Sequence, residues 1–260
     1  MEIVILRDAA DVAEYVADCI ERLVTARPDA VLGLATGSSP LGVYASLARR
    51  HRDAGLSFAQ VRAFQLDEYI GLPPDHPESY RSFVARHFSD VVDIDPANVH
   101  VPDGCAADVT AACAAYEALM REAGGVDLQL LGIGADGHLG FNEPTSSLAS
   151  RTRVKTLTEQ TLLDNARFFG SIDEVPRHVV TQGIGTILEA RHLVLIATGV
   201  AKAEPVARAV EGPLAAICPA SALQLHPHAT VVVDEAAASK LTLADYYRAT
   251  FANKPSWQHS

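Results

Sequence analysis

The chain alternates short apolar runs with longer amphipathic stretches along most of its length. The apolar runs predict strands at residues 2–7, 30–35, 61–66, 127–132, 152–157, 192–197 and 229–234. The stretches between them carry apolar residues at helical spacing and predict helices at 9–26, 40–51, 78–92, 106–123, 159–167, 183–190, 201–211 and 243–249. Strands that alternate with helices in this way predict an α/β fold, with a mostly parallel sheet and helices on both of its faces.

The length and net charge of the chain limit the number of domains and the kinds of partner that we expect. A chain of 260 residues without a linker-like, repeated or low-complexity segment predicts a single domain over 1–260. The net charge of −11 gives no positive field to attract a nucleic acid. The start of the chain lacks the pattern of a signal peptide, and no apolar run approaches the ~20 residues that span a bilayer. We therefore expect a cytoplasmic protein without a nucleic-acid or membrane partner, for which a homo-oligomer remains open.

A small, hydroxyl-rich segment follows the predicted strand 30–35. In parallel α/β sheets, ligands bind beyond the carboxyl ends of the strands. Thr36, Gly37, Ser38 and Ser39 precede a helix that Pro40 can start, so backbone N–H groups and a positive helix end could hold a phosphate here. An ordinary tight turn with a capping serine is the alternative.

Two adjacent carboxylates, Asp67 and Glu68, follow the predicted strand 61–66. A carboxylate that faces a partly desolvated cleft has a raised pKa and makes a good general base. The alternative is a solvated acidic turn or a helix cap.

A glycine-rich loop follows the predicted strand 127–132, with four glycines between residues 132 and 140. Asp136 and His138 are two positions apart, so in an extended loop their side chains point the same way. A nearby aspartate can fix the tautomer of a histidine and raise its proton affinity, and Glu143 adds a second carboxylate. The alternative for a loop histidine is an exposed residue without a role.

Basic residues complete the pattern. Arg151, Arg153 and Lys155 alternate along one predicted strand, while Arg167 and Lys202 lie near helix ends. They could hold a phosphate or be solvated surface charges. Together the motifs indicate an enzyme for a small phosphorylated metabolite that uses carboxylate and histidine chemistry, without a metal or other cofactor. Isomerisation, deamination and hydrolysis all remain open at this point.

Long segments around these motifs resemble the glucosamine-6-phosphate deaminase family. The main matches are Leu66-Asp67-Glu68-Tyr69-Ile70-Gly71-Leu72-Pro73, Gly134-Ala135-Asp136-Gly137-His138-Leu139-Gly140-Phe141-Asn142-Glu143-Pro144 and the segments 76–80, 146–157, 165–169, 209–212 and 223–227. The similarity runs from about residue 3 to about 234, and the tail after about 236 matches poorly.

The resemblance implies a Rossmann-like fold and the conversion of glucosamine 6-phosphate and water to fructose 6-phosphate and ammonia, a step of amino-sugar catabolism. In the family pattern, Asp67 matches the base that removes the proton from carbon 2. His138 matches the group that opens the sugar ring, and Asp136 and Glu143 match the residues that assist it.

The resemblance also implies two phosphate sites. The positions that match the substrate phosphate site are Thr36, Gly37, Ser38, Ser39, Arg167 and Lys202. In some relatives N-acetylglucosamine 6-phosphate activates the enzyme at a subunit interface, and the positions that match that site are Ser146, Arg153, Lys155 and, by a weaker alignment, Tyr246.

Two other functions stay open. A 6-phosphogluconolactonase-type hydrolase on the same fold would need no base for a carbon-bound proton. A non-catalytic sugar-phosphate-binding regulator would keep the phosphate loops and lose the acid–base groups. The segment at Asp67 and the run 141–144 favour the deaminase over both alternatives.

Overall fold

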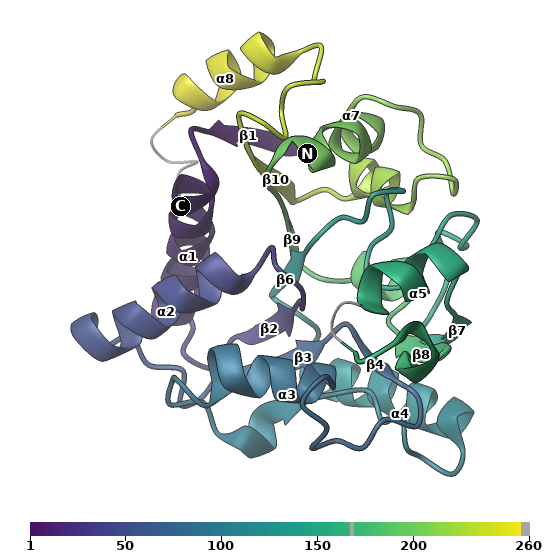
Figure 1. Cartoon of the computed structure of the whole chain (residues 1–260). Coiled ribbons are helices and arrows are strands. Elements are labelled where there is room, and N and C mark those ends of the chain that lie inside the picture. Colours follow the sequence, from purple (N-terminus) through teal and green to yellow (C-terminus); the bar gives the residue numbers. More distant parts are fainter. Residues whose placement is uncertain (167–168, 256–260) are drawn as a thin grey trace.

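The computed structural model describes residues 1–166 and 169–255, and in this part of the chain seven strands form a central parallel sheet (Figure 1). Their order across the sheet is β1-β10-β9-β6-β2-β3-β5, and every pair is parallel. The strands are β1 (Glu2–Leu6), β2 (Val31–Leu34), β3 (Arg62–Gln65), β5 (Val99–His100), β6 (Leu128–Leu131), β9 (His192–Ala197) and β10 (Ala229–Asp234). The predicted mostly parallel α/β sheet is confirmed.

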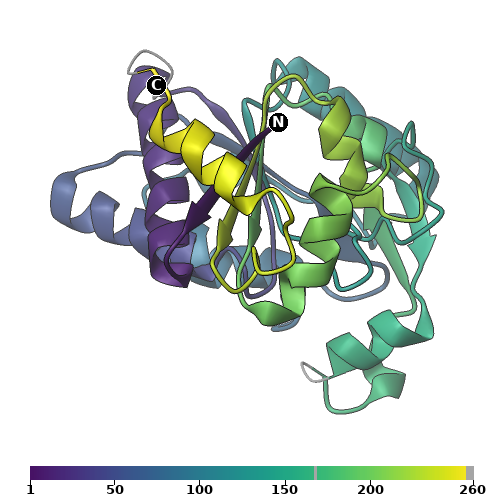
Figure 2. The same cartoon turned by 90° about the horizontal axis from the view of Figure 1, so that it is seen from above.

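Helices cover both faces of this sheet. Figure 2 shows the purple and blue helices α1 and α2 on one side of the strands and the green helix α7 on the other. The α-helices are α1 (Ala9–Ala26), α2 (Leu41–Ala54), α3 (Tyr80–Val84), α4 (Val109–Glu122), α5 (Glu159–Ala166), α6 (Ile184–Ile187), α7 (Ala203–Val210) and α8 (Ala244–Ala252). The shorter helical turns are η1 (Ala85–Ser89), η2 (Pro96–Asn98), η3 (Ile172–Glu174), η4 (Val200–Lys202) and η5 (Pro219–Leu225).

Helix α1 shows how the local sequence sets an element. The Asp8 carboxylate accepts hydrogen bonds from the backbone N–H groups of Ala10 and Asp11, which would otherwise lack partners at a helix start. The helix then buries one apolar stripe that includes Val12, Val16 and Ile20 against the sheet.

A second, smaller sheet is antiparallel and stands beside the main one. It consists of β4 (Asp67–Tyr69), β8 (His178–Thr181) and β7 (Arg153–Thr156), and Thr181 pairs with both Asp67 and Arg153. A separate apolar cluster that includes Tyr69, Phe141 and Val179 lies around this sheet. Helix α5 contributes Leu162 to that cluster and projects from the body of the molecule (Figure 2).

The structure shortens several predicted helices. The predicted helix 78–92 consists of α3 followed by the π-helical turn η1, and of 183–190 only Ile184–Ile187 is α-helical. Strands β4, β5 and β8 were not predicted. Among the described residues, no helix combines the length and the apolar character needed to cross a membrane.

A stacked histidine pair lies at the edge of the sheet opposite to the carboxyl ends of the strands. His192 starts β9, and its ring lies 3.7 Å from the ring of His228 with an angle of 1° between the planes. Burial, followed by the charges of His228, His226 and Lys254, lowers the pKa of His192 to about 4. Because the unfolded chain holds a proton on this ring more tightly, stability is lost as the pH falls from about 6.5 towards 4.

We therefore expect the free energy of unfolding to fall by roughly 2–3 kcal/mol between pH 7 and 4.5 through His192. Urea denaturation of the protein and of a His192→Gln variant at both pH values measures this contribution. The free energy of unfolding of the variant should fall less than that of the original protein, by the amount assigned to His192, since glutamine does not titrate. An equal loss in both proteins would contradict the assignment to His192.

Candidate active site

Residues from the predicted motifs line one cavity of about 380 Å³ at the carboxyl ends of the central strands. The lining includes the loop 36–39 after β2, Asp67 at the start of β4, His138 in the loop after β6, and Lys202 at the end of η4 after β9. The volume lies in the range of sites that enclose a small molecule. Segments that are far apart in the sequence thus meet because their strands are neighbours in a parallel sheet.

The loop 36–39 forms one wall of the cavity with exposed backbone and hydroxyl groups. Gly37 has a φ of 84°, a left-handed conformation that suits glycine. Tyr44 from α2 fixes the start of the loop, because its hydroxyl donates to the Ala35 carbonyl oxygen at 2.7 Å. Lys202 faces the same cavity, and its Nζ donates to the Ile133 carbonyl oxygen at 2.6 Å. This wall combines a cation, hydroxyl groups and the start of α2, as an anion site requires.

Asp67 is a buried carboxylate at the start of β4, with 4% of its surface exposed. Its side chain makes no hydrogen bond or ion pair with another described residue, while it lines the cavity. Burial, followed by the nearby charge of Glu68, holds the pKa of Asp67 well above its usual value. Such a carboxylate is a stronger base than one in water and faces the space that a substrate would fill.

The side chain of Glu68 points away from that of Asp67, because successive side chains of a strand point to opposite faces. Its carboxylate accepts hydrogen bonds from the backbone N–H groups of Tyr69, Tyr80 and Arg81 at 2.9–3.0 Å. Two of these N–H groups belong to the first turn of α3. Glu68 therefore anchors α3 to the strand that carries Asp67 and does not line the cavity.

His138 is brought next to Asp136, as their spacing predicts. His138 Nδ1 lies 2.7 Å from Asp136 Oδ1, although a ring N–H there is not aligned for a hydrogen bond with any described residue. Burial raises the pKa of Asp136, but the contacts with the ring and backbone N–H of His138 outweigh it and hold that pKa below its usual value. The ring packs over Gly134, where a Cβ would lie 2.1 Å from His138 Cε1, so only glycine fits there.

Gly140 joins the glycine-rich loop to the base. A Cβ at this position would lie 3.1 Å from Asp67 Oδ2 and 3.0 Å from Thr181 Oγ1. The residue has a φ of 55° in the left-handed region. The loop can therefore approach Asp67 closely because residue 140 has no side chain.

Glu143, expected to assist the His138 ring, forms no hydrogen bond or ion pair with it among the described residues. Its Oε1 accepts hydrogen bonds from Thr158 and Thr161 at the start of α5, with 2.8 Å to Thr158 Oγ1. Glu143 is buried, and these hydroxyl groups satisfy its carboxylate. The structure thus places Glu143 between the glycine-rich loop and α5.

The predicted basic residues separate into different environments. Arg151 forms ion pairs with Glu117 and Glu189, so it does not reach the cavity. Arg167 lies outside the described residues. Arg153 and Lys155 are half-buried on one face of β7, and Arg153 Nη1 donates to Asn142 Oδ1 at 2.8 Å.

Two further residues were predicted to belong to a second anion site. Ser146 is buried, and its Oγ has no hydrogen-bond partner in the described part of the chain. Tyr246 lies on α8, which packs against β1, and Figures 1 and 2 show α8 and β7 on different sides of the molecule. Within one chain, Tyr246 therefore does not join Arg153 and Lys155.

Several side chains that line the cavity were not predicted as site residues from the sequence. They come from α3, η1, the glycine-rich loop and the region of α5. These residues are Glu78, Tyr80, Phe83, Arg86, Phe141, Thr161, Asn165 and Phe169. Tyr80 and Phe141 stack with 5.9 Å between ring centroids and 6° between planes. Membership of the matched segments 76–80, 134–144 and 165–169 was a usable signal for five of them, Glu78, Tyr80, Phe141, Asn165 and Phe169.

In the described ranges, no group of three or more histidine, cysteine, aspartate or glutamate side chains is arranged to hold a metal ion. Groups that can do chemistry in the cavity include the carboxylates of Asp67 and Glu78, the imidazole of His138 with Asp136 beside it, and the anion-binding wall.

Known proteins are similar to this chain over nearly all of its length. The family model described as glucosamine-6-phosphate isomerases/6-phosphogluconolactonase matches residues 7–233. A glucosamine-6-phosphate deaminase of Arthrobacter sp. (strain FB24) is 65% identical over 258 residues, which cover 99% of each chain.

Solved structures agree with the sequence comparison. A monomeric glucosamine-6-phosphate deaminase matches with a TM-score of 0.90 and 43% identity, covering 92% of this chain and 100% of that chain. A 6-phosphogluconolactonase from Trypanosoma cruzi matches with a TM-score of 0.74 and 21% identity, covering 93% of this chain and 97% of that chain. The second likeness concerns the fold alone.

Proposed function

The chain belongs to the family of glucosamine-6-phosphate isomerases and 6-phosphogluconolactonases, it acts as a glucosamine-6-phosphate deaminase, and we propose that Asp67 and His138 divide its chemistry. The observation that carries this proposal is that a buried, unpaired carboxylate, a histidine with an aspartate beside it and an anion-binding wall meet at one cavity, which Asp67 and His138 line. The cytoplasmic location and the oligomeric state expected from the sequence remain predictions.

We assign the first step, the opening of the sugar ring, to His138. Ring opening moves a proton from the hydroxyl on carbon 1 to the ring oxygen, and imidazole can accept and donate a proton near neutral pH. Asp136 Oδ1, 2.7 Å from Nδ1, limits the rotation of the ring. Glu143 acts in this assignment through α5, whose start it holds against the glycine-rich loop.

We assign the second step to Asp67. In the open-chain aldehyde, the carboxylate removes the proton from carbon 2, which carries the amino group, and an enolamine forms. Return of a proton to carbon 1 gives the imine at carbon 2. Water adds to that imine and ammonia leaves, so that fructose 6-phosphate results. The raised pKa of Asp67 suits this step because a stronger base removes a carbon-bound proton more readily.

We place the substrate phosphate at the wall formed by the loop 36–39 and Lys202. Exposed Gly37 and Ser38 present their backbone there, and Lys202 supplies a positive charge. In this assignment the Ser38 hydroxyl adds a donor. Arg167, which matches the family's phosphate site, is part of the proposal on the sequence alone.

A coupled assay of the purified protein tests this function. Glucosamine 6-phosphate should yield ammonia and fructose 6-phosphate in equal amounts, without added metal or nucleotide. The same preparation is offered 6-phosphogluconolactone as the competing substrate. Lactone hydrolysis without release of ammonia would contradict the deaminase.

We also propose that Ser146, Arg153 and Lys155 bind a second sugar phosphate, as in activated relatives. The unpartnered Ser146 hydroxyl and the two cations on one face of β7 support this site. The rate at low substrate should then rise when N-acetylglucosamine 6-phosphate is added, and the substrate curve should become less sigmoidal. Hyperbolic kinetics that do not respond to this compound would contradict the second site.

A further inference from the structure

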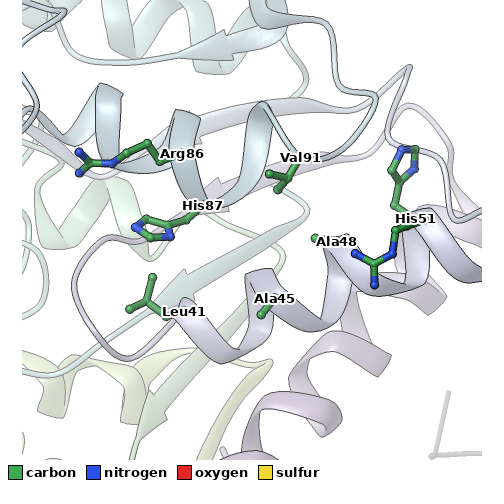
Figure 3. A pocket seen from close by; sticks show the side chains of 8 residues that line it. Leu41, Ala45, Ala48, His51, Arg86, His87 and Val91 are labelled. Carbon is green, nitrogen blue, oxygen red and sulfur yellow. The ribbon is translucent and has the colours of Figure 1, made fainter.

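An open groove of about 620 Å³ lies between α2 and η1 and adjoins the active-site cavity (Figure 3). Part of its lining is apolar, and the rest carries basic side chains without a carboxylate. The lining residues are Leu41, Ala45, Ala48, His51, Arg52, Arg86, His87 and Val91. Two of them, Leu41 and Arg86, also line the cavity that holds Asp67 and His138. Arg86 is therefore the basic residue that the groove and the cavity share.

The other basic residues of the groove have partners of their own. Arg52 Nε lies 2.8 Å from Asp53 Oδ1, and His51 Nδ1 lies 2.7 Å from the Leu56 carbonyl oxygen. The His87 ring packs on Phe83 with 4.6 Å between centroids. Arg86 is exposed and forms no hydrogen bond or ion pair with residues 1–166 or 169–255. Its guanidinium is thus available to a ligand.

Arg86 lies where the groove meets the active-site cavity. It belongs to Ala85–Ser89, which continue α3 as a π-helical turn, a rare distortion that is frequent at functional sites. Figure 3 shows Arg86 at the end of the groove where Leu41 starts α2, far from His51 at the other end. Only Pro40 separates the loop 36–39 from Leu41, and Leu41 and Arg86 line the cavity together at the start of α2.

The charges in the cavity decide what Arg86 can bind. The cavity contains two carboxylates, Asp67 and Glu78, but neither lies within ion-pair distance of Arg86 in the described structure. A planar guanidinium presents paired donors that fit two oxygens of a phosphate, and a dianion is bound best between two cations. Lys202, at the end of η4, is a second cation that lines the same cavity.

We infer that Arg86 is a specificity-determining residue that binds the substrate phosphate together with the loop 36–39 and Lys202. The inference rests on the proposed function for the identity of the substrate. Arg86 recognises the phosphate and takes no part in proton transfer. Its position on α3–η1, which Glu68 holds against β4, couples phosphate binding to the strand that carries Asp67.

The test uses Arg86→Gln and Arg86→Lys in the full chain, with Arg52→Gln as the matched control from the same groove. Arg86→Gln should raise KM for glucosamine 6-phosphate at least about tenfold with kcat within about threefold, since a charged hydrogen bond is lost. Arg86→Lys should recover part of the loss, because it keeps the charge without the planar fork. Arg52→Gln should keep the original KM.

Calorimetric titration with inorganic phosphate separates this inference from the proposed function. The affinity for phosphate should fall at least about tenfold in Arg86→Gln and remain unchanged in Arg52→Gln. Unchanged KM and phosphate affinity in Arg86→Gln, or equal losses in the Arg52 control, would overturn the inference. Should the original protein bind phosphate but release no ammonia, the proposed function fails, and the phosphate titration still decides the role of Arg86.

Discussion

Replacing Asp67 with asparagine is expected to lower kcat for ammonia release by about 10²- to 10⁴-fold and to leave KM within about threefold. Asparagine has nearly the same shape, so the cavity and the phosphate wall stay in place. It cannot accept the proton from carbon 2, because its amide is not basic. Steady-state kinetics with glucosamine 6-phosphate measure both parameters. An unchanged kcat would remove Asp67 from the proposed role.

The same variant should be more stable than the original protein at pH 7. The pKa of Asp67 is raised in the folded state, so the stability it contributes is present below the pKa of the unfolded chain and is lost as the pH rises through the folded value. At neutral pH, the carboxyl group of Asp67 therefore lowers the stability of the fold, and a neutral amide, which does not titrate, avoids this loss. Urea denaturation at pH 7 compares the two proteins. A variant that is less stable as well as inactive would indicate a structural role instead.

The order of strands and helices could be read from the sequence because the central strands are buried on both faces. Strands such as β9 and β10 are continuous apolar runs, and only a parallel sheet between two helix layers hides them completely. The small antiparallel sheet lacks this signal. Strand β4 is only Asp67–Tyr69, and it is held by pairing with β8, which is distant in the sequence. Short strands of this kind depend on tertiary contacts that local patterns do not contain.

Part of the site followed from local spacing and part did not. Asp136 and His138 lie close together because they are two positions apart in one loop. The glycines of that loop permit its sharp turns. Glu143 is only five residues beyond His138, yet α5 supplies its hydrogen-bond partners. Arg86 could not be predicted as a site residue from the sequence, because one arginine among other charges of a helix is typical of an exposed surface. Only the fold places it at the cavity.

Replacing His138 with glutamine should reduce kcat/KM for cyclic glucosamine 6-phosphate by about 10²- to 10³-fold. Glutamine keeps polar atoms at the site but cannot carry a proton from the carbon 1 hydroxyl to the ring oxygen. The 5-deoxy analogue cannot close the six-membered ring, since it lacks the oxygen that closes it. On that analogue the variant should lose less than about tenfold, because Asp67 still performs the later step.

The comparison of the two substrates distinguishes a role in ring opening from damage to the fold, because a variant with a damaged fold would lose activity on both to the same extent. Asp136→Asn is the matched control: it leaves the imidazole present but removes the carboxylate 2.7 Å from Nδ1. We expect this variant to show the same preference for the 5-deoxy analogue with a smaller loss on the cyclic substrate, since the ring is still able to move a proton. Equal losses of kcat/KM on both substrates in His138→Gln would place His138 in the carbon 2 step. The assignment of ring opening to His138 and of the carbon 2 step to Asp67 would then be wrong.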